Sequence, residues 1–157
     1  MSEKRNNLMR ILVLCTHNSA RSQIAEGWLK HYAQELRLNA QIYSAGSEKT
    51  FVKEDAIKVM KENAIDISQH SSKTIDELDN KWNFDIVWTV CDNANEACPI
   101  YPASTTRLHS SFEDPSGQSL KKWREVRDAI GQSSKKLIKV LLTNNTPSQE
   151  DFILNKS

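Results

Sequence analysis

The sequence predicts an α/β domain built on a parallel sheet, and two features of the chain support this. Short apolar runs alternate with segments in which apolar residues recur every three or four positions. Alternating strands and helices are typical of parallel sheets joined by right-handed crossovers. The 157 residues contain no internal repeat and no segment resembling a linker. We therefore expect a single domain over residues 1–157, with a core at 8–142 and a polar tail at 143–157.

The first half of the chain predicts two strands and two helices. Residues 8–14 are a continuous apolar run, which is typical of a strand buried on both faces. Apolar residues then recur at helical spacing over 21–38, which predicts an amphipathic helix. A short strand is expected at 40–44 and a second helix at 54–63.

The second half continues the alternation around a longer loop. A short helix is expected to begin within the stretch HSSKTIDEL, with Ser72 or Thr74 as its N-cap. The remaining expected elements are a third strand at 84–90, an irregular loop at 91–103, a shorter fourth strand at 106–110 and a final amphipathic helix at 120–142.

The bulk composition excludes some partners. Hydrophobic residues make up 38% of the chain and charged residues 26%, and the formal net charge is +1. A charge so close to zero argues against broad attraction to nucleic acid or to a membrane surface. The apolar run at 8–14 is too short to span a membrane, and no cleavage pattern of small residues follows it. We therefore expect a cytoplasmic protein.

Cys15 ends the first predicted strand, and a helix begins a few residues later. Ligands of open parallel sheets bind beyond the carboxyl ends of the strands. The backbone N–H groups of a helix start suit a tetrahedral oxyanion, and Arg21 can add a two-pronged positive clamp. The same groups are expected to lower the pKa of the Cys15 thiol, and Ser22 could donate its hydroxyl to the sulfur. A cysteine here can also be merely a small apolar residue.

Cys91 and Cys98 follow the third predicted strand and are separated by seven positions. Structural disulfides are rare in the cytoplasm, which favours the interpretation of these cysteines as catalytic or metal-binding thiols. Without paired spacing the cysteines make a poor zinc site, although a histidine might complete one, and both could be unreactive and buried. The third interpretation is a redox relay in which one thiol attacks an adduct and another moves the resulting disulfide outward. The candidate zinc-completing histidines are His17, His70 and His109.

Asp114 is the candidate general acid. It lies in the stretch FEDPSG, where Pro115 restricts it to an extended conformation and Gly117 completes a turn. This loop follows the fourth predicted strand and should overhang the same edge of the sheet as Cys15. A carboxylic acid there could protonate an oxygen that leaves the bound oxyanion. The competing interpretation is a simple turn aspartate, and Glu113 and Asp92 are rival acids.

The stretch CTHNSARS resembles the phosphate-binding loop of the low-molecular-weight protein tyrosine phosphatases. Its continuation SQIAEGW, together with YSAGSE, resembles the arsenate reductases that share this fold, and the resemblance spans residues 8 to about 142. It implies a four-stranded sheet of order 2-1-3-4, with Cys15 as nucleophile and Asp114 as acid. It also implies that arsenate, or phosphate or sulfate as analogues, binds to Thr16, His17, Asn18, Ser19, Ala20, Arg21 and Ser22.

The resemblance further implies a reaction that depends on all three thiols. In thioredoxin-coupled reductases of this kind, thiols at the positions of Cys91 and Cys98 act in sequence after the loop nucleophile. Arsenate would leave as arsenite, and thioredoxin would reset the enzyme, with glutaredoxin and glutathione as the alternative reductant. We expect a monomer with no cofactor and no metal. The rival functions are a tyrosine phosphatase using Cys15, Arg21 and Asp114, and a non-enzymatic oxyanion-binding or thiol-sensing module.

Three positions depart from the family pattern. His17 stands where the phosphatases and many reductases have glycine, and Ala20 stands where some relatives have another cysteine. Lys73 stands where some reductases have a carboxylate that helps to hold a potassium ion. A fixed ammonium could replace that ion, so we expect little potassium dependence. Asn18, Glu26 and Ser44 match the rest of that neighbourhood.

Overall fold

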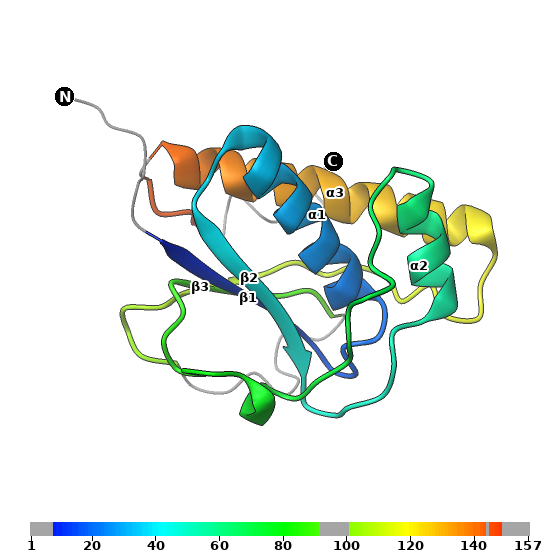
Figure 1. The fold of residues 1–157 in the computed structure, drawn as a ribbon, viewed down its shortest axis with the longest axis horizontal. Coiled ribbons are helices and arrows are strands. Elements are labelled where there is room, and N and C mark those ends of the chain that lie inside the picture. The colour runs from blue at the N-terminus through cyan, green and yellow to red at the C-terminus, as the bar shows by residue number, and fades with distance from the viewer. Residues whose placement is uncertain (1–7, 92–100, 144, 149–157) are drawn as a thin grey trace.

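The computed structural model describes residues 8–91, 101–143 and 145–148. Strands and helices alternate as predicted, and every predicted strand is present (Figure 1). The elements are β1 (Met9–Cys15), α1 (Arg21–Leu36), β2 (Ala40–Gly46), α2 (Glu54–Lys61), the 3₁₀ helix η1 (Ile75–Glu77), β3 (Ile86–Thr89), β4 (Thr106–His109) and α3 (Leu120–Leu142).

The four strands form one parallel sheet of order β2-β1-β3-β4, which confirms the predicted fold class. Cys15 of β1 pairs with Gly46 of β2, and Leu14 pairs with Thr89 of β3. The carboxyl ends of β1, β2 and β3 therefore meet at one edge of the sheet. This edge is where a parallel sheet places its ligands.

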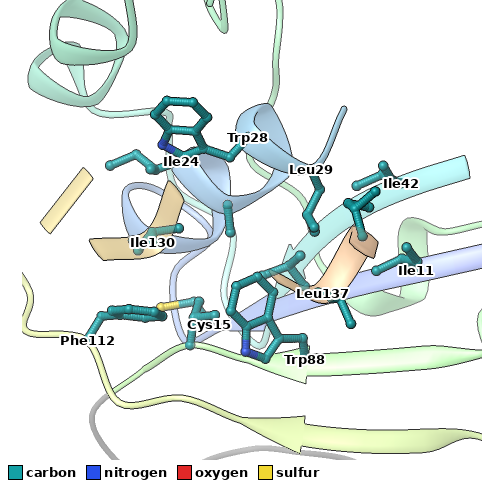
Figure 2. Packing of buried hydrophobic residues seen from close by; sticks show 14 of the residues in the cluster. Ile11, Cys15, Ile24, Trp28, Leu29, Ile42, Trp88, Phe112, Ile130 and Leu137 are labelled. Carbon is teal, nitrogen blue, oxygen red and sulfur yellow. The ribbon is translucent and has the colours of Figure 1, made fainter. Parts of the chain in front are cut away.

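The two faces of the sheet are covered differently. In Figure 1 the three α helices lie on one side, and η1 with its flanking loops lies on the other. Ile11 of β1 points into the helical side, where Trp88 and Leu137 also pack (Figure 2), and Val13 belongs to the same cluster. Leu12 and Leu14 point to the opposite side, where Phe84 belongs to a smaller cluster. β1 is therefore buried on both faces, as its continuous apolar run predicts.

Several element ends differ from the predicted ones for local reasons. α1 ends at Leu36, two residues early, because Arg37 adopts a left-handed conformation with φ 64°. α2 ends at Lys61, two residues before its predicted end, and Ala64 soon takes a left-handed conformation with φ 62°. The stretch HSSKTIDEL forms only one 3₁₀ turn, although Thr74 caps it as expected through a capping box with Glu77.

The final helix α3 has the predicted bounds. The Ser119 hydroxyl accepts a hydrogen bond from the Lys122 backbone N–H at 3.3 Å and so satisfies one of the free donors of the first turn. β2 extends two residues past its prediction, to Gly46. Within the described residues, no helix is both long and apolar enough to cross a membrane.

Candidate active site

The loop after β1 is fixed by hydrogen bonds to its outward-facing carbonyl groups. The Thr16 oxygen accepts from the Glu48 N–H at 3.0 Å, and the Ser19 oxygen accepts from the Lys53 N–H at 2.9 Å. The His17 oxygen accepts from the Ser72 hydroxyl at 3.1 Å. In a trans peptide the N–H points opposite to the carbonyl, so the next N–H after each of these oxygens points toward the inside of the loop. This orientation is the one an oxyanion cradle needs.

Gly46 allows the end of β2 to pack against this loop. A Cβ atom at this position would lie 2.5 Å from the Thr16 oxygen, 2.8 Å from the Cys15 oxygen and 2.9 Å from the Asn18 nitrogen. These three are backbone atoms, which cannot move aside for a new Cβ atom as a flexible side chain could. Any larger residue here would therefore displace the loop that carries the candidate oxyanion site.

Asn18 holds the loop from within. Its backbone has φ 51°, a left-handed conformation that asparagine tolerates better than most residues, and its side chain is fully buried. Its amide nitrogen donates to the hydroxyl groups of Ser22 and Ser44, both at 2.9 Å. Its amide oxygen accepts from the Lys73 N–H at 2.9 Å and from the Gln23 amide at 3.0 Å. Four hydrogen bonds of the Asn18 side chain thus brace the loop.

A buried carboxylate lies behind Asn18. The Ser44 hydroxyl donates to Glu26 at 2.5 Å, and Glu26 is only 5% exposed. The ammonium group bound to this carboxylate belongs to Lys30, at 2.6 Å. The Lys73 side chain donates instead to the Ser71 carbonyl at 2.9 Å, and burial first of all lowers its pKa, with Glu26 opposing that effect. The positive charge that compensates the Glu26 carboxylate, which we expected from Lys73, is therefore supplied mainly by Lys30.

Arg21 and Asp114 lie together over the loop. The Arg21 guanidinium donates to the Phe112 carbonyl at 2.9 Å and lies 3.8 Å from the Asp114 carboxylate. Arg21 is buried, whereas the Asp114 side chain is 46% exposed. Partial burial would raise the pKa of Asp114, but hydrogen bonds from Ser116 and the positive charge of Arg21 leave it below its ordinary value.

Cys15 and Cys91 lie side by side. The Val90 N–H donates to the Leu14 carbonyl at 3.0 Å, which carries the chain beyond β3 alongside β1. Both thiols are free and buried, they belong to the same core cluster, and their side chains are hydrogen-bonded to each other. Figure 2 shows Cys15 on the helical side of the sheet, near the ring of Phe112.

This contact changes the ionisation of the nucleophile. The hydrogen bond with Cys91, and then burial, raise the pKa of the Cys15 thiol far above its ordinary value. The Arg21 charge and the Thr16 backbone N–H lower it, as expected, but they do not outweigh the first two causes. The expectation of a lowered pKa is therefore wrong for this arrangement of the two thiols, because it left out the Cys91 thiol, which follows the neighbouring strand β3.

The remaining candidate residues differ in their surroundings. His17 is exposed and its imidazole lies 3.1 Å from the Glu48 carboxylate. Ser22 and Ala20 are buried at the start of α1, and Ser19 is buried beside them. Cys98 and Asp92 lie outside the described residues. Within those residues, no three histidine, cysteine or acidic side chains gather as they would around a metal ion.

The sequence interpretation missed Gln23. This side chain is fully buried, and its amide nitrogen donates to Asn18 and to the Ser71 carbonyl at 3.1 Å. Its amide oxygen lies 3.0 Å from the His70 ring nitrogen. Gln23 lies on the side of α1 that carries Glu26 and Gly27, away from Ile24 and Trp28, so the spacing of apolar residues gave no signal of its burial.

Comparison with known proteins now defines the class. The family model described as low molecular weight phosphotyrosine protein phosphatase matches residues 10–146, and the chain belongs to this family. Within it, arsenate reductase 2 of Staphylococcus saprophyticus is 44% identical over 127 residues, covering 80% of this chain and 92% of the relative. The arsenate reductase of Halalkalibacterium halodurans is 46% identical over 132 residues, covering 80% and 91%. The predicted resemblance to the arsenate reductases of this family is confirmed.

Solved structures agree on the fold. A structure of an arsenate reductase in the phosphate binding state superposes with a TM-score of 0.73 at 30% identity, covering 83% of this chain and 97% of the other. The arsenate reductase of Archaeoglobus fulgidus superposes with a TM-score of 0.67 at 29% identity, covering 82% and 98%.

Proposed function

We propose that this arsenate reductase acts through a relay of three thiols and is reset by thioredoxin. The contact between the Cys15 and Cys91 side chains is the observation that carries the proposal. Hydrolysis of a cysteinyl adduct by water needs one thiol. Reduction of arsenate needs two electrons, which two thiols supply together when they form a disulfide. A second thiol within hydrogen-bond reach of the nucleophile is what the reductive reaction requires.

The first step forms the adduct. Arsenate lies in the loop from Thr16 to Ser22 with its oxygens on the inward N–H groups and on Arg21. The Cys15 thiol passes its proton to a bound arsenate oxygen as its sulfur bonds to arsenic, and an arsenate hydroxyl leaves as water with a proton from Asp114. The Arg21 charge, 3.8 Å from Asp114, favours the ionised carboxyl in the free protein. A bound oxyanion neutralises this charge, which lets Asp114 hold the proton that it donates.

The second step transfers the electrons. The Cys91 sulfur attacks the Cys15 sulfur, a disulfide forms, and the electron pair of the breaking sulfur–arsenic bond stays on arsenic. Arsenite leaves and takes up protons from solvent. Cys98 then attacks Cys91, which releases Cys15 as a thiolate and forms a Cys91–Cys98 disulfide. The dithiol of thioredoxin reduces that disulfide and is itself oxidised to a disulfide, which leaves with thioredoxin.

The decisive experiment compares Cys91→Ser with the parent protein in thioredoxin-coupled arsenate turnover. We expect the variant to lose turnover because no second thiol can attack the adduct. Cys91→Ser should still hydrolyse a simple aryl phosphate slowly through Cys15, whereas Cys15→Ser should lose both activities. Sustained arsenate turnover by Cys91→Ser would overturn the relay and leave ester hydrolysis, the phosphatase alternative, as the function of the site.

The thioredoxin step has its own test. Cys98→Ser should consume two thiols per arsenate in a single turnover and then stop as a Cys15–Cys91 disulfide. If Cys98→Ser turns over as fast with thioredoxin as the parent does, Cys98 has no place in the relay. If only glutaredoxin with glutathione supports the parent protein, the reductant proposed here is the wrong one.

Asp114 can be tested against its nearest rival. Asp114→Asn cannot donate a proton, so we expect its kcat for arsenate to fall by about 10²–10⁴-fold. Glu113→Gln is the matched control, since Glu113 is bound to Gln118 at 3.1 Å and to Lys122 at 3.2 Å rather than to Arg21. A larger loss in Glu113→Gln than in Asp114→Asn would transfer the role of the acid to Glu113.

A further inference from the structure

A groove runs along α3, on a part of the surface that the proposed reaction does not use. It consists of two adjoining cavities of about 400 Å³ and 630 Å³, which share Gln132 and Lys136 in their walls. One end is bounded by residues 111–113, immediately before Asp114. The other end is bounded by Thr143 and Asn145, where the described chain leaves α3. We call these two cavities together the α3 groove.

The two ends of the α3 groove differ in chemistry. Near the acid loop, the walls include the apolar groups of Phe112, Val126 and Ala129. At the floor there, the buried Ser133 hydroxyl has no hydrogen-bond partner among the described residues. Toward Asn145, three exposed lysines border the groove. These are Lys135, Lys136 and Lys139.

The end of the sequence carries the complementary chemistry in the matching order. After Ser148 comes the stretch QEDFILNKS, in which Glu150 and Asp151 precede the apolar triplet formed by residues 152–154. We propose that this segment, residues 149–157, docks into the α3 groove of the same chain. Its two carboxylates lie along the lysines, and Phe152, Ile153 and Leu154 reach toward the apolar end.

The chain is long enough for this path. Pro147 is buried and lines a small cavity together with Leu141 and Asn145, so it lies near the level of Leu141 on α3. The shared residue Gln132 lies nine positions before Leu141, which is ~14 Å along a helix. Phe152 is five residues beyond Pro147, a reach of ~17 Å for extended chain. Phe152 can therefore arrive at the point where the two cavities meet.

Docking there connects the segment to the catalytic edge. Phe112 forms one wall of the α3 groove, and its carbonyl holds the Arg21 guanidinium at 2.9 Å. A docked segment thus braces the loop that carries Asp114. The family model ends at residue 146, so this brace is an addition outside the shared domain.

Hydrogen exchange on the full chain tests the proposal without using arsenate turnover. In the parent protein, the amides of 152–154 should exchange about tenfold or more slowly than in a variant with all three residues changed to Ser. The same variant should expose residues 111–113 to faster exchange. If 152–154 exchange at the rate of an unstructured peptide in the parent protein, the segment does not dock and the proposal is wrong.

A charge swap tests the path of the segment. Lys139→Glu should weaken the protection of 152–154, and adding Glu150→Lys should restore it. Lys121→Glu is the matched control, because Lys121 is exposed on the same helix but borders neither cavity. Equal loss of protection in Lys121→Glu and Lys139→Glu, or no rescue by the second change, would overturn the proposed path.

The same samples distinguish docking within one chain from docking between copies. Protection that is independent of protein concentration, with the light-scattering mass of one chain, supports the proposal. Protection that rises with concentration together with a doubled mass would show that the segment occupies a second copy, and the proposal within one chain would be wrong.

Discussion

Asn18 is the residue on which the geometry of the oxyanion loop depends most. Its side chain joins α1, β2 and the segment before η1 to the loop through four hydrogen bonds, with no exposure to water. A buried group that loses its partner costs about 1–3 kcal/mol, so removing the amide affects several groups at once.

We therefore expect Asn18→Ala to lower the free energy of unfolding by ~3 kcal/mol or more. Asn18→Gly loses the same hydrogen bonds but accepts φ 51° without strain, so it should be ~1 kcal/mol more stable than Asn18→Ala. Urea unfolding at neutral pH measures both differences. If glycine is no better than alanine at this position, the left-handed backbone contributes nothing to the loop.

The Glu26 neighbourhood argues for potassium independence. The Glu26 carboxylate already has an ammonium partner in Lys30, at 2.6 Å, so a bound cation would meet a compensated charge. Arsenate turnover should be equal in potassium buffer and in a buffer of a bulky organic cation. Lys30→Gln, which removes the partner, should create a potassium requirement. Several-fold activation of the parent protein by potassium would contradict this view.

At the residue scale, the sequence could predict which side chains meet at the sheet edge but not the contacts among them. Cys15 ends β1, and its proximity to Cys91 follows from the adjacency of β1 and β3. The direction of the shift in the Cys15 pKa could not be deduced, since it depends on a hydrogen bond to Cys91, just beyond the end of β3. The choice of Lys30 over Lys73 likewise rests on packing that residue spacing does not encode.

One carboxylate at the end of α2 binds two arginines of α3. Glu62, at the C-cap of α2, accepts three hydrogen bonds from the Arg124 guanidinium, at 3.0, 3.3 and 3.0 Å, and one from Arg127 at 2.8 Å. The hydrogen bonding of Arg124 is the largest cause that lowers the pKa of Glu62 to about 2. Burial opposes it, and the hydrogen bond from Arg127 and the charges of both arginines add to the lowering.

Because this pKa is lowered in the folded state, Glu62 stabilises the protein fully above its ordinary range near pH 4.5 and progressively less as pH falls toward 2. Glu62→Gln should therefore be less stable than the parent protein at pH 7, and the two unfolding free energies should converge on acidification. Glu54→Gln, at the other end of α2, is the control. A difference that stays constant from pH 7 to pH 3 would show that the carboxylate charge is irrelevant to this contact.

At the element scale, prediction succeeded where a local signal exists. Ser119 starts α3 through its hydroxyl, and the bounds of that helix are as expected. Prediction failed where a helix ends because a residue other than glycine adopts a left-handed backbone conformation, as Arg37 does after α1. The capping box at Thr74 likewise predicted where the short helix η1 begins, although such a signal does not say how long a helix continues.

For the whole molecule, the sheet separates two apolar clusters that share β1. Neighbouring residues of this strand enter opposite clusters: Ile11 belongs to the helical side and Leu12 to the side of η1, and both are fully buried. Neither cluster can lose its packing without disturbing the strand that the other also needs. We therefore propose that residues 8–142 unfold as one cooperative domain.

Truncation on either side of β1 tests this cooperativity. Ile11→Ala and Leu12→Ala should each lower the free energy of unfolding by about 2–5 kcal/mol and shift one shared transition. Far-UV circular dichroism, near-UV circular dichroism and calorimetry should give the same midpoint for each variant. Leu8→Ala is the control, since Leu8 is 42% exposed beside the same strand and should change little. If Leu12→Ala splits the transition while Ile11→Ala does not, the cluster on the side of η1 unfolds as a separate unit. The end of the sheet that carries the active site would then be supported by two units that unfold independently.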